Sequence, residues 1–285
     1  MSVGVKIIKE GLRTTIQDKG RIGYAEFGIP KAGAMDQTSF LLANLLLNNK
    51  ENDAVLEWVG IPPVLLFEVR TVICVTGGEC EVLLDAKKMP MNVPFEVFEG
   101  SKLSFKNSKK GLYFFVGIKG GFKTESILNS RSFFMNITAT SVLKKGDEIG
   151  CEKHLGLSTK NTKVSAPFYK RNFSVIEVFP GPEWEQLTKE QKQFLLETTF
   201  TISNVINRMA IQLIETVHNN LKSMLTSPVL PGTIQLTPAG KLIVLMRDCQ
   251  TTGGYPRILQ LTEMSIDVLA QKHPQSTFRF VLKNY

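Results

Sequence analysis

Short runs of apolar and β-branched residues recur along the chain, separated by turns rich in Gly, Pro, Asn or Lys. Strand-like runs at this spacing predict a mainly β fold, built as a barrel or a sandwich rather than from β–α–β units. They dominate as far as residue 178, resume at residue 200 and continue almost to the end of the sequence. The expected strands cover residues 3–8, 54–58, 64–68, 71–75, 81–84, 95–98, 103–105, 112–116, 175–178, 200–203 and 242–246.

Two segments have the composition of helices. Residues 36–48 carry apolar side chains around most of a helical circumference, which predicts a well-buried helix. The acid at its start, Asp36, can cap the helix or meet its dipole, and the Asn48-Asn49 pair can end it. Residues 183–198 show an amphipathic pattern with glutamates and a preceding proline at the start, as helix N-termini favour. The fold class we expect is therefore mainly β with a few short helices.

Three stretches between these elements lack a regular period. Residues 11–24 are punctuated by glycine and rich in hydrogen-bonding side chains, so they cannot form a regular helix. Residues 28–34 contain Pro and Gly and predict a rigid turn. Residues 153–172 are polar, and we interpret them as a linker or an exposed loop.

The most informative stretch is residues 247–257, which follows the apolar run 242–246 directly. A buried strand that ends abruptly in Gln-Thr-Thr-Gly-Gly places hydroxyls, an amide and backbone N–H groups at the rim of a sheet. Ligands are commonly held at such positions, so the stretch predicts a binding site. The alternative is an ordinary Gly-Gly turn between two strands.

A faint internal echo accompanies this stretch. Thr76-Gly77-Gly78 also follows an apolar run, 71–75, and repeats the Thr-Gly-Gly ending. Two related barrels from a duplicated unit would explain the similarity, and chance resemblance between two strand-to-turn junctions explains it equally well.

Three polar clusters are candidates for chemistry: Gln17 and Asp18 with Arg21, residues 33–36, and the 247–257 stretch together with Asn204, Asn207 and Arg208. Each has a structural alternative. Asp18 and Arg21 could form a local ion pair. Arg208 interrupts an apolar run, so it lies on a solvent face or pairs with an anion.

Composition narrows the class of protein. The 285 residues are 43% hydrophobic and 21% charged, which suits a soluble globular chain with a substantial core. The net charge of +8 could suggest nucleic acid, but the lysines are scattered without interleaved aromatic residues, so we do not expect nucleic-acid binding. No apolar run is long enough to span a membrane and the N-terminus lacks a signal-peptide pattern, so a cytoplasmic location is expected.

The familiar catalytic signatures do not occur. We find no phosphate-binding G-x-x-x-x-G-K-[ST], no G-x-S-x-G and no H-E-x-x-H, and Gly120-Gly121 is better interpreted as a β-turn than as a phosphate loop. The four cysteines form no C-x-x-C pair and the three histidines are far apart, so neither disulfides nor a metal site are expected. Any chemistry must rely on positioned donors and acceptors.

The order of several motifs resembles the biotin-dependent carboxyltransferase family. Its members include the C subunit of 5-oxoprolinase, the KipA regulator, allophanate hydrolase subunit 2 and half of the urea carboxylase carboxyltransferase domain. The resemblance covers nearly the whole chain. The matching segments are residues 11–18, 28–30, 33–36, 43–46, 56–57, 207–209, 232–235 and 250–256.

The resemblance implies two cyclophilin-like β-barrel domains, which we place at residues 1–172 and 173–285, with exchange of terminal segments between the barrels left open. It implies a B-type partner subunit and an A subunit. The chain has no biotin-attachment Ala-Met-Lys-Met and no ATP-binding signature, so ATP would act through the complex, and biotin enters only in an alternative function.

The function that the resemblance implies is the C subunit of an ATP-dependent 5-oxoprolinase, inactive alone, acting on a small molecule. The alternatives are a KipA-like regulator that binds a B-type inhibitor, or half of a biotin-dependent urea carboxyltransferase. The catalytic residues are unknown, with Asp18, Asp36 and Arg208 as candidates. The expected substrate-binding residues are Met35, Asn207, Arg208, Gln250, Thr251, Thr252, Gly253, Gly254 and Tyr255.

The chain also departs from the family pattern. Ala210 stands where the family usually has Gly, and Gln212 where it has Arg. Thr226-Ser227-Pro228 replaces an acidic Ser-Glu-Gly. Loss of a Glu and an Arg implies altered substrate choice, or a subunit kept mainly for assembly.

Overall fold

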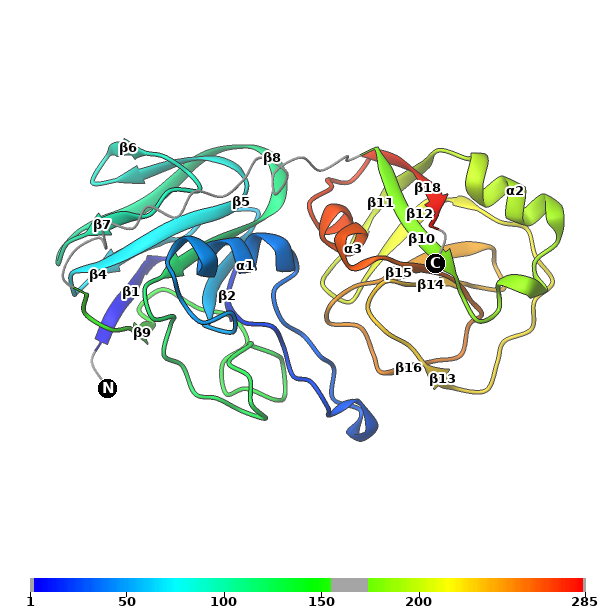
Figure 1. The fold of residues 1–285 in the computed structure, drawn as a ribbon, viewed down its shortest axis with the longest axis horizontal. Coiled ribbons are helices and arrows are strands. Elements are labelled where there is room, and N and C mark those ends of the chain that lie inside the picture. The colour runs from blue at the N-terminus through cyan, green and yellow to red at the C-terminus, as the bar shows by residue number, and fades with distance from the viewer. Residues whose placement is uncertain (1–2, 155–173, 284–285) are drawn as a thin grey trace. The chain divides into compact units, whose positions relative to one another are not determined.

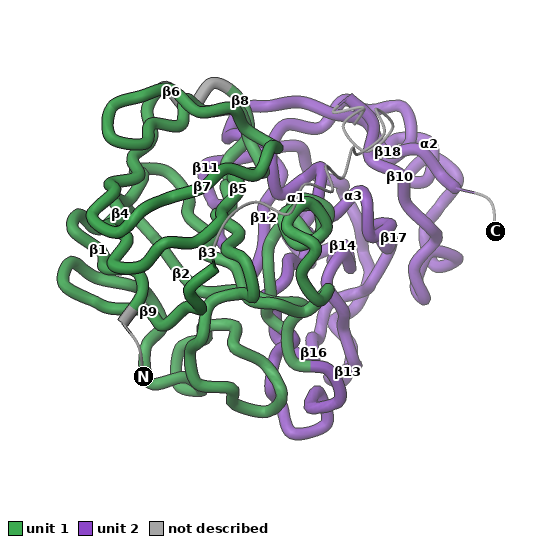
Figure 2. Tube along the Cα trace, turned by 60° about the vertical axis from the view of Figure 1, so that its left-hand side comes forward, with its two compact units in different colours: residues 1–21, 32–169 green, residues 22–31, 170–285 purple. Residues whose placement is uncertain are grey.

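The computed structural model describes residues 3–154 and 174–283, which fall into two compact units. The first unit comprises residues 1–21 and 32–169, and the second comprises residues 22–31 and 170–285 (Figure 2). The expected boundary at residues 172 and 173, and nearly all of the expected linker, lie outside the described residues. Each unit is described by itself below.

The first unit is built on a nine-stranded sheet that forms a half-barrel (Figure 1). Its main path runs β2-β3-β8-β4-β1-β9, and β5 pairs with β6, β7 and β8. The strands are β1 Val3–Lys9, β2 Arg13–Gln17, β3 Val55–Val59, β4 Val64–Phe67, β5 Thr71–Leu84, β6 Lys87–Met89, β7 Phe95–Val97, β8 Lys102–Ile118 and β9 Glu148–Gly150.

Two strands of the first unit are longer than the sequence indicates. The runs 71–75 and 81–84 belong to the single strand β5, and 103–105 and 112–116 belong to β8. The β5–β8 ladder continues through register shifts on either side of Glu79. Gly77 has a φ of 101°, and a Cβ there would stand 2.4 Å from the carbonyl oxygen of Tyr113. Glycine thus bends the strand in its interior, where we expected a turn.

This continuous strand corrects the interpretation of the internal echo. Thr76-Gly77-Gly78 lies in the middle of β5 and not at the rim of a sheet. It therefore does not correspond in position to the Thr-Gly-Gly of residues 252–254, and the proposed similarity of the two junctions is wrong.

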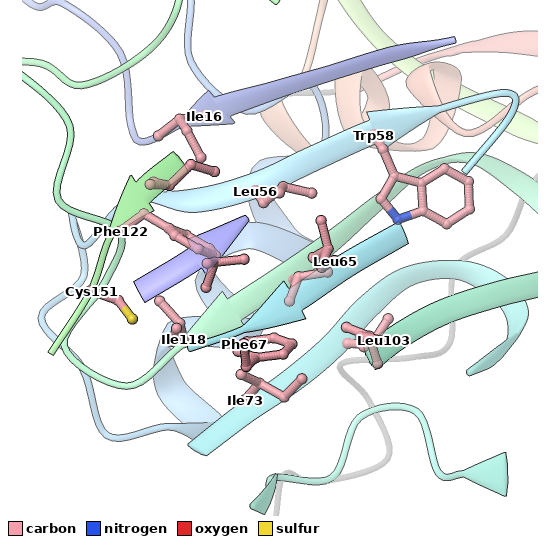
Figure 3. Close-up of a cluster of buried hydrophobic side chains, with 14 of the residues drawn as sticks. Ile16, Leu56, Trp58, Leu65, Phe67, Ile73, Leu103, Ile118, Phe122 and Cys151 are labelled. Carbon is pink, nitrogen blue, oxygen red and sulfur yellow. The ribbon is translucent and has the colours of Figure 1, made fainter. Parts of the chain in front are cut away.

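The core of the first unit is apolar and aromatic (Figure 3). The rings of Trp58 and Phe114 stack with centroids 4.1 Å apart, an arrangement that adds to the area they bury. Helix α1, Gln37–Leu46, covers the sheet as predicted. Gly117 permits its close approach, because a Cβ there would stand 3.0 Å from the side chains of Ala43 and Leu47.

The second unit contains a closed barrel with strand order β10-β17-β14-β15-β12-β11-β18. The mainly β class is thereby confirmed. The strands are β10 Val175–Pro180, β11 Phe200–Ile206, β12 Ala210–Thr216, β14 Thr233–Leu236, β15 Lys241–Leu245, β17 Arg257–Leu261 and β18 Thr277–Leu282, with a separate pair β13 Ser227–Pro228 and β16 Thr252–Gly253. Helix α3, Glu263–Ala270, follows β17 in a region where only strand-like segments were predicted, so that part of the prediction is wrong.

The predicted helix over residues 183–198 is divided. A 3-10 turn covers Trp184–Gln186, and helix α2 covers Lys189–Glu197. Thr188 starts the second piece, because its side chain accepts from the N–H of Gln191 and forms a reciprocal capping box with that residue. The amphipathic pattern of the sequence continues across Thr188, so it did not reveal that a new helix begins there.

Candidate functional site

The loop of residues 250–256, which follows β15, is supported by a neighbouring segment of the same unit. Its β16 pairs with β13, so that Gly253 lies opposite Ser227 and Thr252 opposite Pro228. The N–H of Val229 donates to the carbonyl of Thr251 at 3.0 Å. Thr252–Gly253, in the middle of this sequence, therefore forms a short strand rather than an unsupported turn.

Gln235 supports the loop from the barrel. It lies in β14, is 2% exposed, and its Nε2 donates to the carbonyl of Tyr255 at 3.5 Å. A Cβ at Gly253 would stand 2.4 Å from the same nitrogen, so only glycine fits there without displacing the amide. Two motifs separated in the sequence, Gly-Thr-Ile-Gln and Gln-Thr-Thr-Gly-Gly, thus meet in the fold.

The outer side of the loop is accessible. Thr252 and Tyr255 are exposed, while Gln250, Thr251 and Gly254 are half-buried. These residues offer hydroxyls, an amide and a phenol ring, groups that can bind an anionic or polar ligand. Residues 250–255 include no carboxylate, imidazole or thiol that could act as a base or a nucleophile.

Arg208 forms a buried ion pair with Asp248 at the base of the loop. Its Nε and Nη2 donate to the two carboxylate oxygens at 2.7 and 2.8 Å, and both side chains are almost fully buried. The N–H of Asp248 also donates to the carbonyl of Arg208. The expectation that Arg208 pairs with an anion is confirmed, and the anion is a residue of this chain.

Asn207 shapes the turn that carries Arg208. Its side-chain oxygen accepts from the N–H of Met209 at 2.7 Å and from the N–H of Ala210 at 3.0 Å. Such short-range bonds are how Asn stabilises turns. The turn joins β11 to β12, and the N–H of Met246 donates to the carbonyl of Met209. Asn207 and Arg208 therefore lie at the end of the barrel from which residues 246–249 emerge.

Arg247, at the start of the 247–257 stretch, is a polar anchor whose partners the sequence did not identify. Its side chain is fully buried and donates to Glu263 at 2.7 Å and to Asp267 at 2.9 Å, both on α3. Burial alone would raise the pKa of Glu263, but the charge of Arg247 and its hydrogen bond lower it more, so the pKa lies below its ordinary value. A signal was present in the sequence: Glu263 and Asp267 are four residues apart, and in a helix this spacing places both acids on one face.

A second pairing that the sequence did not reveal joins Glu183 to Arg257, the last residue of the 247–257 stretch. One carboxylate oxygen of Glu183 accepts from the N–H and Nε of Arg257 at 2.8 and 3.0 Å, and the other accepts from Nη2 at 2.9 Å. Arg257 Nη1 also donates to the carbonyl of Pro228 at 2.8 Å. These bonds tie the end of the 250–256 loop to β13 and to the segment that follows β10.

The positions that depart from the family pattern lie beside this loop. Ser227 and Pro228 form β13, the direct partner of β16. Ala210 packs against a small buried cluster that contains Val229 and Leu245. Gln212 lies two residues along the same strand, opposite Ile243 of β15. The departures therefore lie on two strands, β12 and β13, of which β13 pairs directly with the loop.

The first unit holds the other predicted cluster, and there Asp18 acts as a clamp. Its carboxylate accepts from the hydroxyls of Ser130 and Ser132 at 2.7 and 2.6 Å, and from the N–H groups of Gly20 and Arg131 at 2.8 and 2.7 Å. Arg21 donates to the carbonyl of Ser132. A buried carboxylate with four donors holds segments together more readily than it moves a proton.

Asp36 caps helix α1, as its position predicted. Its two oxygens accept from the N–H and the hydroxyl of Ser39 at 3.0 and 2.6 Å. The neighbouring Met35 is buried, and its N–H donates to the Glu57 carboxylate at 2.8 Å. The structure thus places Asp18, Met35 and Asp36 in the first unit, and Asn207, Arg208 and residues 250–255 in the second.

Other kinds of site find little support in the described residues. Burial raises the pKa of Cys249 and of Cys80 to about 12 and that of Cys151 to about 11, and it also raises the pKa of Cys74.

Residues 3–154 and 174–283 hold no cluster of three metal-binding side chains. No helix in the same part of the chain combines the length and apolar character needed to cross a membrane.

Curated relatives match over different lengths. The 5-oxoprolinase C subunit of Escherichia coli is 30% identical over 275 residues, which cover 94% of this chain and 87% of the relative. Urea amidolyase of Saccharomyces cerevisiae is 37% identical over 148 residues, covering 50% of this chain but 8% of that protein.

Solved structures share the fold. TTHA0988 matches with a TM-score of 0.86 at 23% identity over 98% of this chain, which spans 55% of the TTHA0988 chain. Urea carboxylase of Kluyveromyces lactis matches with a TM-score of 0.87 at 25% identity over 99% of this chain and 27% of its own. The family model described as carboxyltransferase domain, subdomain A and B, matches residues 27–282. The chain belongs to this carboxyltransferase domain family.

Proposed function

We propose that the chain is the C subunit of an ATP-dependent 5-oxoprolinase complex, which opens 5-oxo-L-proline to L-glutamate together with A and B subunits. The observation that carries the proposal is the near full-length match to a 5-oxoprolinase C subunit, with 94% of this chain and 87% of the relative covered. A match over both lengths supports a shared role better than a match to part of a larger enzyme.

In this proposal the 250–256 loop binds the substrate. 5-Oxoproline carries a carboxylate and a lactam, and both are hydrogen-bond acceptors. The side chains of Gln250, Thr251 and Thr252, with backbone N–H groups near Gly253 and Gly254, would hold the carboxylate or a phosphorylated lactam. The fixed geometry that β13 and Gln235 give the loop suits such preorganised binding.

Arg208 and Asn207 act as positioning residues in this scheme. Arg208 Nε and Nη2 donate to Asp248 within 2.8 Å, so its charge is largely satisfied before any ligand arrives. Its role is to hold the start of the loop. For Met35, Asp18 and Asp36 we propose a supporting role at the second family motif, since each is engaged by backbone or hydroxyl groups or by packing.

The partner subunits supply what this chain lacks. The loop offers hydrogen-bond donors and acceptors but no thiol nucleophile. Cys249, next to the loop, is protonated at neutral pH because burial raises its pKa to about 12. Gly120 and Gly121 form a turn, with φ values of 76° and 72°, and give no phosphate-binding helix start. We therefore place ATP on the A or B subunit and expect the isolated chain to be inactive.

A second candidate is half of a biotin-dependent urea carboxyltransferase. The 37% identity with urea amidolyase over 148 residues favours it, because local identity there exceeds that with the oxoprolinase relative. The changed residues beside the loop, Gln212 and Ser227, would then adapt the same binding loop to a different acceptor. In that case biotin would arrive on a separate carrier.

The test is reconstitution. The chain is co-expressed with A and B subunits, and 5-oxoproline-dependent ATP hydrolysis and glutamate release are measured with and without it. Thr252→Ala should reduce turnover by roughly ten-fold, as expected for loss of one or two substrate hydrogen bonds. Thr216→Ala, an exposed threonine at the end of β12, serves as the matched control and should leave turnover unchanged.

The other outcomes separate the alternatives. A stable three-subunit complex without 5-oxoproline-dependent ATP hydrolysis contradicts the proposal. Carboxylation of urea from a carboxylated biotin carrier would support the second candidate. Binding to a B-type subunit with neither activity would instead indicate a regulatory, KipA-like role.

A further inference from the structure

A cavity in the first unit is lined by none of the residues assigned above to substrate. Its volume is about 360 Å³, within the range of small-molecule sites. Its lining comes from three segments, residues 123–127, 133–143 and 147–150, all of the first unit. No motif identified in the sequence predicted it.

The floor of the cavity is apolar. Phe133, Leu143 and Ile149 are 6, 4 and 2% exposed and belong to the hydrophobic core of the unit. An apolar surface of this kind is poorly hydrated, and it gains free energy when an apolar ligand covers it. The rim, by contrast, includes exposed Glu125 and Ala139.

One hydroxyl at the cavity lacks a protein partner. The Oγ1 atom of Thr124 is buried and makes no hydrogen bond within the described residues. The hydroxyl of Thr138, which also lines the cavity, is engaged by Phe134 and Thr140. Neither hydroxyl is therefore offered to a ligand, because the Oγ1 atom of Thr124 is closed to solvent and the Thr138 hydroxyl is already bonded.

Among the charged residues that line the cavity, carboxylates outnumber ammonium groups. Lys123 pairs with Glu152 at 2.9 Å, and Glu148 pairs with Lys6 at 2.8 Å, so these two lining residues are neutralised by neighbours. The other two acids of the lining are Glu125 and Asp147. The Asp147 carboxylate accepts a hydrogen bond from the backbone N–H of Lys144, in the same turn, at 2.8 Å. An excess of carboxylate favours a cationic ligand.

The Asp18 clamp gives the cavity a fixed wall. It binds Ser130, Arg131 and Ser132, which lie between two of the lining segments. The N–H groups of Phe133 and Leu143 donate to carbonyls of the β2 strand at 2.9 and 2.7 Å. A wall held at several points is preorganised, which lowers the cost of binding.

We infer that this cavity binds a small organic amine with an apolar body, whose ammonium group lies at Glu125 and Asp147. The site is independent of the proposed oxoprolinase role. It would allow an amine metabolite to bind this unit without competing for the 250–256 loop.

The probe is 2-phenylethylamine, titrated into the isotopically labelled full chain and followed by amide chemical shifts. Shifts confined to residues 123–127, 133–143 and 147–150 are expected, and 3-phenylpropanoate, of similar shape and opposite charge, should leave them unmoved. Absence of saturable shifts in these segments, or equal binding of the two probes, overturns the inference.

Variants locate the site. Glu125→Gln should weaken binding by about two- to five-fold, as expected for one exposed charge, while the matched exposed acid Glu99→Gln should not. Ala139→Phe, at the exposed rim, should obstruct the cavity without entering the core. Unchanged affinity of the Ala139→Phe protein for the amine counts against the site.

Discussion

Gly253 lies directly over the side-chain amide of Gln235, so closely that a Cβ at Gly253 would stand 2.4 Å from Nε2. The contact joins the middle of the 250–256 loop to the barrel strand β14. Since Gln235 is 2% exposed, its amide has little room to move away. This close contact limits how near residue 253 of the loop can approach strand β14.

Gly253→Ala should therefore displace either the amide or the loop. We expect a loss of about 1–3 kcal/mol in the free energy of unfolding, the range typical of overpacking, measured by urea denaturation. Gln235→Ala should remove the clash, so that the double variant is more stable than the sum of the two single effects. Strict additivity would show that the two residues do not interact.

Arg208 and Asp248 should be strongly interdependent. Arg208→Ala leaves a buried carboxylate without its bidentate partner and should cost about 3–5 kcal/mol of unfolding free energy. Replacing both residues by apolar ones, as in Arg208→Met with Asp248→Leu, should cost less than either single truncation. A double variant less stable than Arg208→Ala would contradict this account of the pair.

Local pattern was sufficient for several features of the fold. Short runs of apolar and β-branched residues indicated strands β1, β3, β4, β5, β7, β8, β10, β11 and β15, and the composition of residues 36–48 indicated the buried helix that Asp36 caps. The local pattern failed at Gly77, where glycine bends a strand without ending it. It also failed at Thr188, which starts a new helix within a continuous amphipathic pattern.

The long-range partners could not be predicted in the same way. Asp18 and Ser132 are 114 residues apart, and Glu183 and Arg257 are 74 apart. Hydrophobic periodicity and turn sequences predict the conformation of residues that are close in the sequence. The bonds of Asp18 with Ser132 and of Glu183 with Arg257 instead depend on which loops the sheets place side by side. For Arg208 the sequence predicted an anionic partner, and only the fold identifies it as Asp248.

The pair of Glu183 and Arg257 should make stability depend on pH in the acid range. Burial alone would raise the pKa of Glu183, but the hydrogen bonds and charge of Arg257 outweigh it and hold the pKa below its ordinary value. The folded state therefore binds this proton less readily than the unfolded state. Its stabilising effect is fully present above the unfolded pKa of about 4.3 and is lost as pH falls through the folded pKa.

Glu183→Gln tests this dependence. The variant should be less stable than the parent at neutral pH, and the difference should shrink as pH is lowered below about 4. Urea denaturation at a series of pH values gives the comparison. Glu185→Gln is the control: its ion pair with Lys192 lies at the surface, with the Glu185 side chain 85% exposed, so its loss should change stability little at any pH.

Asp18→Asn should loosen the segment that follows Ile127. The amide can accept fewer of the four hydrogen bonds that the carboxylate accepts, and each charge-assisted bond contributes about 1.5–3 kcal/mol. The expected loss of unfolding free energy is roughly 2–4 kcal/mol. Hydrogen exchange at the N–H of Arg131 should accelerate most. Equal acceleration throughout the second unit would contradict a local clamp.

The cysteines should resist alkylation in the folded chain. Burial raises the pKa of Cys249 to about 12, and those of Cys80 and Cys151 to about 12 and 11, so the thiolate fraction near pH 8 is below about one in a hundred. A disulfide reagent should therefore react slowly with the native protein and with all four thiols after unfolding in urea. Fast reaction at Cys249 in the native chain would instead reveal a nucleophile beside Gln250, and the loop would then have to be considered for covalent chemistry as well as for binding.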